Sequence, residues 1–473
     1  MAAGLLRYEK LAAELEGMIA SGALRPGDRL PSVRRLGLER RLSISTVLQA
    51  LRQLEQRALV EARPQSGYFV RSVGRARAEP LTRTTPVLPV AVDVSQRLAG
   101  VLQAGMKPGV APFAAALPAP SLLPLAALHR LYAGVARRHP KLLEGGNYIQ
   151  MDEPALLRQL VRRSLAWGGP LADQEIVITN SCTEALGLCL RVVTKPGDTV
   201  AVESPAYYLM LQLLETLGLK ALEIPTDPGT GISVEALDLA TRHGGVAACL
   251  LVPNASNPLG SVMPDDRKRR LASLMASRGV AVIEDDIYGD LHYGSQRPWP
   301  IKAFDTAGNV LLCSSFSKSL TPSLRIGFVA AGRYRSAVAL QKTLTSGATN
   351  PITQHVLAEY LESGAYERHL RGLRRSYENQ LERMRAAVGR YFPAATRMAR
   401  PLGGFVLWVE LPEEIDTSRL HARAVAENLA YVPGELFSPS GMYRNCLRLN
   451  CGNPHTPEID DAVRRLGALI EKR

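Results

Sequence analysis

The stretch that decides the fold runs from Val310 to Lys318, Val-Leu-Leu-Cys-Ser-Ser-Phe-Ser-Lys, and is followed at residues 324–327 by Leu-Arg-Ile-Gly. Its apolar first half predicts a buried strand, and hydroxyl side chains and a lysine follow directly. A lysine amine can bond covalently to an aldehyde, and hydroxyl groups with an arginine such as Arg325 suit a phosphate. The stretch therefore predicts a strand-end site for a ligand that carries both groups.

Similar apolar runs occur repeatedly between residues 92 and 473, with helix-like stretches between most of them. The expected strands are Ile176–Thr179, Thr199–Val202, Ala247–Val252, Val280–Ile283, Val310–Cys313 and Ile326–Val329. Strands that alternate with helices predict an α/β fold with a mostly parallel sheet and helices on both faces. They also predict a ligand near the carboxyl ends of the strands.

Polar residues occur where these strands end. Asn180-Ser181-Cys182-Thr183 can form a phosphate cup at a helix N-terminus, although Ser and Thr are also ordinary helix caps. Tyr207 can lie flat on an aromatic ring, although a tyrosine packed in the core is the ordinary alternative. Asn257 can donate to a phenolate oxygen, although its segment can also be a plain turn. Asp285 can hold a pyridinium proton, or can bind Mg²⁺ together with its acidic neighbours.

The combination of these motifs decides between the alternatives. A phosphate cup, a ring aromatic, Asn, Asp, Tyr, Lys and Arg follow one another in this order at successive strand ends. Together they predict a site for pyridoxal 5′-phosphate, with Lys318 as the amine that binds its aldehyde. No metal site is predicted.

The first 72 residues have a different organisation. Apolar residues at helical spacing predict three short helices, the third opening at Ser43-Ile44-Ser45-Thr46-Val47, and two β-prone runs around Gln65-Ser66-Gly67 predict a hairpin. This order is typical of a winged helix-turn-helix, an α+β domain whose third helix enters the major groove of DNA. Residues 1–72 hold 12 Lys and Arg against 7 Asp and Glu, which favours the same partner.

The whole chain of 473 residues carries a formal net charge of +13. Its length predicts more than one domain, and its charge favours a polyanion as partner. No apolar run long enough for a membrane span occurs, and no signal peptide, so we expect a cytoplasmic protein with no membrane partner. The six cysteines form no CxxC pair and are expected to be reduced. Residues 73–91, with three prolines and three arginines, predict an extended linker.

Residues 1–72 resemble the DNA-binding domain of GntR-type bacterial regulators. The matching motifs are Leu30-Pro31-Ser32-Val33-Arg34, Ser45-Thr46-Val47 with Ala50-Leu51, Leu54-Glu55, and Ser66-Gly67-Tyr68. The resemblance implies that Gly67 lets the wing approach the DNA backbone, and that DNA is contacted by Arg34, Ser43, Ser45 and Thr46. That family often has an arginine where this chain has Ile44, which cannot make arginine's bidentate contact to guanine. A different operator contact is therefore expected there.

Residues 92–473 resemble the fold type I pyridoxal-phosphate enzymes of the aspartate-aminotransferase superfamily, on the strand-end motifs quoted above. The resemblance implies that Lys318 forms the Schiff base, that Asp285 pairs with the pyridine nitrogen, and that Arg448 pairs with an amino acid's α-carboxylate. It assigns the other cofactor contacts to Asn257 and Tyr288 at the ring oxygen, Tyr207 on the ring face, Ser181, Cys182, Thr183, Ser315, Ser317 and Arg325 at the phosphate, and Tyr148 at the partner subunit's phosphate. It also implies a homodimer. Glu153 stands where the family usually has glycine.

Both halves together resemble the MocR subfamily of GntR regulators. The expected domains are a winged helix at 1–72, a linker at 73–91 and an aminotransferase-like domain at 92–473. The leading hypothesis is a regulator that binds double-stranded operator DNA. In this hypothesis an amino acid or related amine displaces Lys318 from the cofactor and forms an external aldimine. A working aminotransferase, a DNA-binding protein with an inert structural domain, and the cofactor itself as the signal remain alternatives.

Overall fold

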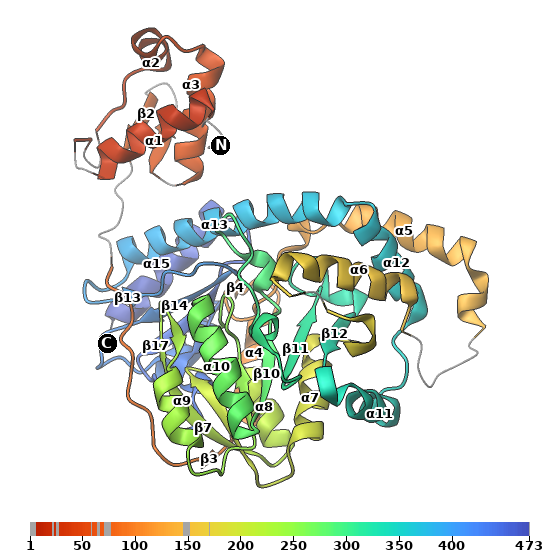
Figure 1. Ribbon diagram of the computed structural model, residues 1–473. Coiled ribbons are helices and arrows are strands. Elements are labelled where there is room, and N and C mark those ends of the chain that lie inside the picture. The colour runs from red at the N-terminus through yellow and green to blue at the C-terminus, as the bar shows by residue number, and fades with distance from the viewer. Residues whose placement is uncertain are drawn as a thin grey trace. The chain divides into compact units, whose positions relative to one another are not determined.

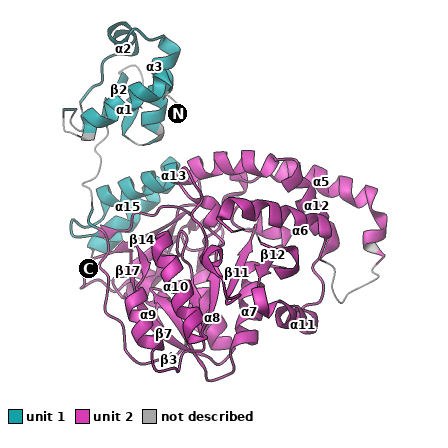
Figure 2. Ribbon diagram, in the orientation of Figure 1, with its two compact units in different colours: residues 1–78, 378–396, 455–473 teal, residues 79–377, 397–454 magenta. Residues whose placement is uncertain are grey.

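The computed structural model describes residues 6–20, 23–24, 28–57, 59–63, 67–70, 77–144, 152–169 and 171–472. These residues form two compact units, which Figures 1 and 2 show. The first unit contains residues 1–78, 378–396 and 455–473, and the second contains residues 79–377 and 397–454. The long helix α13 (Ala365–Tyr391) supplies residues to both.

The N-terminal part of the first unit has the predicted winged helix-turn-helix fold. Its elements are α1 (Arg7–Ala20), α2 (Val33–Arg40), α3 (Ile44–Gln56), β1 (Val60–Arg63) and β2 (Gly67–Val70). Ser32 and Ser43 cap α2 and α3, because their hydroxyl oxygens accept from backbone N–H groups of the first turn. The strands β1 and β2 pair antiparallel, and the N–H of Leu30 adds a 2.8 Å hydrogen bond to the carbonyl of Tyr68 beside them.

A small apolar core holds these elements together. The helix α3 contributes Val47, Ala50, Leu51 and Leu54, which have no exposed surface. Their spacing places them on one face of the helix. The rest of this core consists of Leu11, Ala12, Leu15, Leu30, Leu36, Val60 and Val70. Because one face of α3 is used for packing, its opposite face is left for a partner.

The second unit is built on a central sheet of nine strands. Eight of them lie in the order β3-β7-β6-β9-β10-β11-β12-β5, and β8 pairs with β7. The strands are β3 (Val90–Ala91), β5 (Ile176–Thr179), β6 (Thr199–Ser204), β7 (Lys220–Asp227), β8 (Gly231–Ile232), β9 (Ala248–Leu251), β10 (Ala281–Asp285), β11 (Val310–Ser315) and β12 (Gly327–Ala330). All six strands that the sequence predicts are present, so the predicted α/β fold is confirmed.

The direction of the strands decides which residues meet. The strands β7, β6, β9, β10 and β11 are parallel, whereas β12 is antiparallel to both β11 and β5. The carboxyl ends of β5, β6, β9, β10 and β11 therefore lie at one edge of the sheet together with the start of β12. This arrangement brings Arg325, which precedes β12, to the same edge as Lys318, which follows β11.

Helices cover both faces of this sheet (Figure 1). One face packs on α7 (Cys182–Val193), α8 (Tyr208–Thr216) and α11 (Arg335–Thr345). The other face packs in two clusters, one with α9 (Val234–Thr241) and α10 (Asp265–Arg278), and one with α5 (Leu125–Arg138), α6 (Pro154–Ser164), α12 (Pro351–Glu362) and the first half of α13. Successive strand residues such as Leu250 and Leu251 alternate between the two faces.

A second, antiparallel sheet lies in the C-terminal part of the chain and was not predicted from the sequence as a sheet. It contains β13 (Arg397–Met398), β14 (Val406–Glu410), β17 (Cys446–Asn450) and β16 (Val432–Pro433), in that order. Cross-strand pairing places Trp408 beside Arg448. The remaining elements are α4 (Ser95–Gly105), α14 (Thr417–Ala426), α15 (Pro457–Glu471) and the parallel pair β4 (Ala111–Pro112) and β15 (Leu429–Ala430).

Much of the predicted linker has defined contacts in this structure. Residues 79–91 belong to the second unit, and their last two residues form β3, which pairs with the edge strand β7 (Figure 1). The Arg83 guanidinium donates to Glu410 Oε1 and to Asn445 Oδ1, both at 2.8 Å, and lies 5.0 Å from the Tyr443 ring centre. The hydroxyl of Thr82 donates to Asp227 Oδ2 at 3.1 Å. This segment is thus an ordered strap on the large unit.

Candidate functional site

A cavity of about 160 Å³ lies at the sheet edge where the strand ends meet. The predicted site residues that line it are Ser181, Cys182, Thr183, Tyr207, Asp285, Tyr288, Ser315, Ser317, Lys318 and Arg325. Asn257 and Arg448 are buried close to it. Both act to lower the pKa of Tyr288, and Arg448 also lowers the pKa of Lys318. Tyr148 lies outside the described residues.

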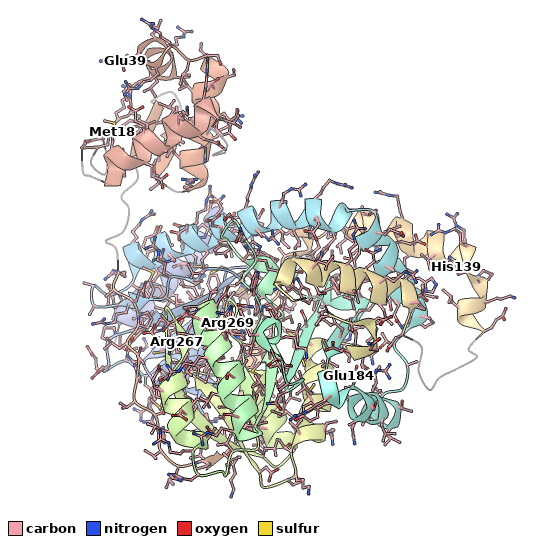
Figure 3. The ribbon with its side chains drawn as sticks, in the orientation of Figure 1. Met18, Glu39, His139, Glu184, Arg267 and Arg269 are labelled. Carbon is pink, nitrogen blue, oxygen red and sulfur yellow. The ribbon has the colours of Figure 1, made fainter. Side chains whose placement is uncertain are left out.

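The start of α7 forms one wall of this cavity. Ser181 caps the helix, because its Oγ accepts from the N–H of Glu184 at 3.1 Å. Glu184, labelled in Figure 3, binds Asn180 in turn through its carboxylate. A Cβ on Gly327 would come 2.6 Å from the Ser181 carbonyl carbon, so only glycine allows β12 to approach this turn so closely. The helix N-terminus and its backbone N–H groups therefore face the cavity as a ready site for an anion.

Asp285 ends β10 at the floor of the cavity and is 3% exposed. Its Oδ1 accepts from the N–H of Ile287 at 3.0 Å and from the thiol of Cys182 at 3.3 Å. Burial raises the pKa of Asp285 to about 6, against the lowering effect of these two hydrogen bonds. The group is still mainly a carboxylate at neutral pH, so it can pair with a protonated ring nitrogen.

Lys318 projects into the cavity from the segment after β11. Its Nζ donates to the backbone carbonyl of Ala116 at 2.6 Å. Burial, and then the positive charge of Arg448, lower the pKa of Lys318 to about 8, although Asp285 acts in the opposite direction. About a tenth of this amine is therefore unprotonated at pH 7, far more than of an ordinary lysine, and the unprotonated amine is the form that attacks a carbonyl.

Arg448 is a fully buried arginine on β17, with no exposed surface. Its Nη2 donates to the hydroxyl of Tyr208 at 3.0 Å, and its Nε and Nη1 have no hydrogen-bond partner among the described residues. A buried cation with two unused donors is costly, and no carboxylate of the described residues forms an ion pair with it. The arrangement is suited to a carboxylate that arrives with a ligand.

Three further polar side chains surround the cavity. Burial raises the pKa values of Tyr207 and Tyr288 well above those of ordinary phenols, so both keep their protons. The side-chain oxygen and nitrogen of Asn257 are buried without a hydrogen-bond partner of normal geometry in the described part of the chain. The Tyr288 hydroxyl lies close enough for Asn257 to lower its pKa slightly, but burial outweighs this effect.

These residues fit pyridoxal phosphate as a group. The unpaired amide of Asn257 and the phenol of Tyr288 can serve a ring oxygen, the carboxylate of Asp285 can serve a ring nitrogen, and the N-terminus of α7 can serve a phosphate. Each polar group of the cofactor thus has a counterpart in the cavity wall. The thiol of Cys182 is engaged by Asp285, which leaves the backbone N–H of Cys182 for an anion.

The apolar part of the wall was missed by sequence reasoning. It consists of Leu117, Leu186, Leu209, Met210, Leu213, Ile287 and Pro322. The carbonyl of Ala116 was missed as well, because a backbone acceptor leaves no mark on residue type. The leucines of α8 carried no signal beyond ordinary helical amphipathicity.

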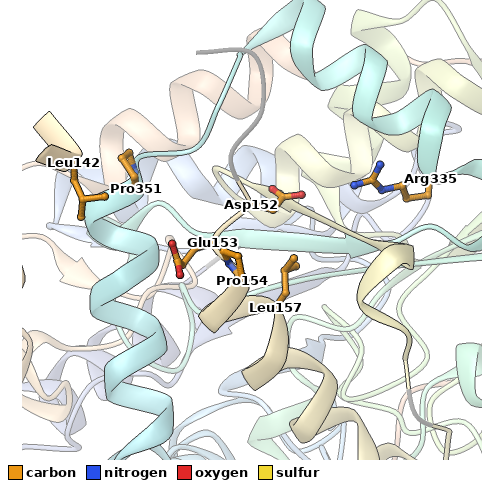
Figure 4. Close-up of a pocket in the computed structure, with 7 residues that line it drawn as sticks. All are labelled: Leu142, Asp152, Glu153, Pro154, Leu157, Arg335 and Pro351. Carbon is orange, nitrogen blue, oxygen red and sulfur yellow. The ribbon is translucent and has the colours of Figure 1, made fainter. Parts of the chain in front are cut away.

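A larger cavity of about 420 Å³ lies beside α6 and α12 and is shown in Figure 4. Its two carboxylates, Asp152 and Glu153, are already engaged. Asp152 Oδ1 accepts from the N–H of Ile178 at 3.2 Å, and Glu153 caps α6 while its other oxygen lies 3.3 Å from His355 Nδ1. Glu153, which replaces the glycine usual in the family, therefore serves as a helix cap.

The predicted DNA-contacting residues lie on the surface of the winged helix. Arg34, Ser43 and Ser45 are exposed and Thr46 is half-buried. Gly67 begins β2 with a φ of 98°, a conformation that favours glycine. A Cβ there would lie 3.6 Å from Arg29 Nε, so the turn is tight without being blocked. These positions leave the start of α3 and the start of β2 open to a partner.

Within the described residues, no helix is both long and apolar enough to cross a membrane. In the same residues no cluster of three or more His, Cys, Asp or Glu side chains is arranged to hold a metal ion. All six cysteines lie in the described part of the chain, where they are buried as thiols and form no disulfide.

Two family matches together span most of the chain. Residues 132–466 match the family described as aminotransferase class I and II, and residues 7–70 match the bacterial regulatory proteins of the gntR family. The HTH-type transcriptional regulator YjiR of Escherichia coli is 40% identical over 98% of this chain and 99% of its own length.

Solved aminotransferases have the fold of the large unit. A multiple substrate aminotransferase from Thermococcus profundus superposes with a TM-score of 0.73 at 29% identity, over 79% of this chain and 94% of its own. LysN, an α-aminoadipate aminotransferase from Thermus thermophilus solved with N-(5′-phosphopyridoxyl)-L-leucine, gives 0.72 at 30% identity, over 80% of this chain and 97% of its own.

Proposed function

The chain belongs to the class I and II aminotransferase family and, through its gntR-type domain, to the MocR subfamily of transcriptional regulators, and we propose that its large unit is the sensor of an amino compound. It is a DNA-binding regulator with an aminotransferase-like domain, and pyridoxal 5′-phosphate is its cofactor. The amino compound that binds in the cavity changes the affinity of the winged helices for the operator. We place this activity in the cytoplasm, where the DNA of a bacterial regulator lies.

The residues around the cavity have defined parts in this proposal. When bound, the cofactor supplies an aldehyde that condenses with primary amines. Lys318 holds it while no effector is present, Asp285 keeps its ring nitrogen protonated, and Asn257 and Tyr288 serve its ring oxygen. The phosphate is held by the start of α7 together with Ser181, Thr183, Ser315, Ser317 and Arg325, and by Tyr148 of the second copy in a homodimer. Tyr207, which lines the cavity, would stack on the face of the ring.

The single observation that carries the proposal is the buried Arg448 with two unused donors. A cation in this state is stabilised when a carboxylate enters the cavity, so an amino acid is favoured over a simple amine. The pairing of Arg448 with the carboxylate stabilises the protein only when the amino acid is bound. A ligand that interacts differently with two states shifts the balance between them, which is what a sensor requires.

The strand β17 connects the effector to the linker. Its first residue, Cys446, lies 3.8 Å from an Arg83 nitrogen through its sulfur, and Arg448 follows two residues later. Its last residue, Asn450, donates to the carbonyl of Leu117 at 3.2 Å, next to the Ala116 carbonyl that binds the Lys318 amine. The strand β17 therefore contacts the linker, carries Arg448, and contacts the segment at Ala116 and Leu117 to which the Lys318 amine donates.

Replacing Arg83 by alanine is expected to uncouple the two domains. The variant should load the cofactor and bind amino acids normally, because Arg83 does not line the cofactor cavity. The change in operator affinity on adding effector, for which a coupling of about 1–3 kcal/mol is typical, should largely disappear. Electrophoretic mobility shift titrations with and without effector measure it. Arg270→Ala, which removes an exposed arginine paired with Glu235, is the control, and an unchanged response in Arg83→Ala contradicts this route.

The pH dependence of cofactor loading should report the lowered pKa of Lys318. The unprotonated amine is the reactive form, so the rate of covalent uptake by the apoprotein should rise with pH, reach half its maximum near pH 8 and level off above. Borohydride trapping at timed intervals measures this rate. A rate that still rises about tenfold per pH unit at pH values well above 8 would mean that the amine has the pKa of an exposed lysine.

Footprinting on the upstream region of the gene, with cofactor and a panel of amino acids, tests the proposal as a whole. We expect a protected site whose affinity changes with one class of amino acid. Rapid multiple turnover with a 2-oxo acid, in the absence of any protected site, would favour a working aminotransferase instead.

A further inference from the structure

Ile44 is an apolar side chain at an exposed position of the recognition helix. It is the first residue of α3, and 53% of its surface is exposed. Among the described residues of the winged helix, the only other large apolar side chains with this degree of exposure are Leu6 and Leu38. Ile44 is neither part of the apolar core of the domain nor one of the partly buried side chains packed against it, so the packing of the domain does not account for this isoleucine.

The surroundings of Ile44 are polar. The Ser43 hydroxyl lies 2.9 Å from Ser45 Oγ and 2.7 Å from Thr46 Oγ1, so it binds both of the other hydroxyls at the start of the helix. Arg34 on α2 is exposed and supplies a positive charge. Ile44 is therefore an apolar residue between hydroxyl side chains of the type that contacts sugar and phosphate groups.

The edges of the bases in the major groove restrict what such a side chain can recognise. Guanine offers two acceptors, adenine an acceptor and a donor, and cytosine a donor, and an isoleucine can satisfy none of them. Thymine alone offers an apolar group, its 5-methyl. A branched aliphatic side chain at the first turn of the recognition helix matches that group in chemistry and in size.

We propose that Ile44 contacts the 5-methyl group of a thymine in each half-site, and so determines which base pair the operator has at that position. The inference rests on the DNA-binding function of the winged helix. The proposed contact depends on a single methyl group. The side chain of Ile44 has no hydrogen-bonding group with which it could distinguish the bases.

The test uses the full-length protein loaded with cofactor. The operator is first obtained by selection from randomised duplexes, and each thymine is then replaced singly by deoxyuridine, which removes only the methyl group. At one thymine per half-site the affinity of the wild-type protein should fall about four-fold, the value of one buried methyl-sized group. In Ile44→Ala the same substitution should have no effect. Leu38→Ala, which removes an exposed leucine of α2, should keep the wild-type discrimination.

Two further measurements sharpen the result. A 5-methylcytosine at the same position should bind the wild-type protein better than cytosine, and Ile44→Arg should select guanine there. The inference is overturned if no thymine is sensitive to loss of its methyl group, or if Ile44→Ala keeps the sensitivity. If selection enriches no sequence, the proposed regulatory function fails, and the inference fails with it. If an operator is enriched but shows no dependence on a thymine methyl group through Ile44, only the inference fails.

Discussion

Replacing Lys318 by alanine is expected to abolish covalent attachment of pyridoxal phosphate, and with it the response of operator binding to amino acids. Among the described residues, Lys318 is the one lysine that lines the cofactor cavity, and its lowered pKa favours the reactive amine. The start of α7 and Asp285 are unchanged in the variant, so the cofactor should still bind noncovalently. Borohydride reduction followed by mass spectrometry should find the label on the peptide that contains Lys318 in the wild-type protein, and on no peptide of the variant.

The control for this experiment is Lys195→Ala, which removes an exposed lysine beyond the end of α7. It should be labelled and should respond to effector as the wild-type protein does. If Lys318→Ala kept both the label and the effector response, another amine would hold the cofactor and the assignment of the site would fail. If it lost the label but kept the response, the sensor would work without release of the lysine.

Replacing Arg448 by methionine is expected to have two opposite effects. The affinity for amino acids should fall roughly 10- to 150-fold, because a charged pairing worth about 1.5–3 kcal/mol is lost. Amines without a carboxylate should be unaffected. The ligand-free protein should become more stable, by about 1–4 kcal/mol, because a buried guanidinium with unused donors is replaced by an apolar chain. Effector titrations followed by absorbance, and denaturant unfolding of the ligand-free protein, measure the two effects.

Arg297 provides the matched comparison for stability. It too is buried, but its guanidinium pairs with Asp286 and, at 2.9 Å, with Asp290. Arg297→Met should therefore destabilise the protein, by about 3–5 kcal/mol, because the buried carboxylate of Asp286 loses its charged partner, although Asp290 keeps its ion pair with Arg163. Equal losses of stability in Arg448→Met and Arg297→Met would contradict the view that Arg448 is held without a compensating charge.

The sequence predicted the strands and the strand-end residues because parallel strands leave simple marks: a short apolar run and then a polar turn. It did not predict β7, where Glu223 interrupts the apolar pattern. Glu223 is buried in the structure, and the hydroxyl of Ser204 donates to it at 2.7 Å. An acidic residue within the run therefore did not exclude a buried strand.

The sequence also could not predict contacts that depend on the backbone or on distant segments. The carbonyl of Ala116 faces Lys318 from 202 residues earlier in the chain, and any residue type could supply it. The attachment of Arg83 to Glu410 and Asn445 joins segments that are 327 and 362 residues apart. The composition of the linker predicts an extended chain but says nothing of the surface that its residues contact.

The strap formed by residues 79–91 has a consequence for the solution behaviour of shortened chains. It contacts β7 at two places, through Thr82 at Asp227 and through Val90 at Ala221. Its last two residues therefore cover the first part of β7, where unpaired backbone groups would otherwise recruit a strand from another molecule. A fragment cut at residue 92 should aggregate through that edge, whereas one that starts at residue 79 should remain dispersed. Light scattering of the two fragments at equal concentration would distinguish them.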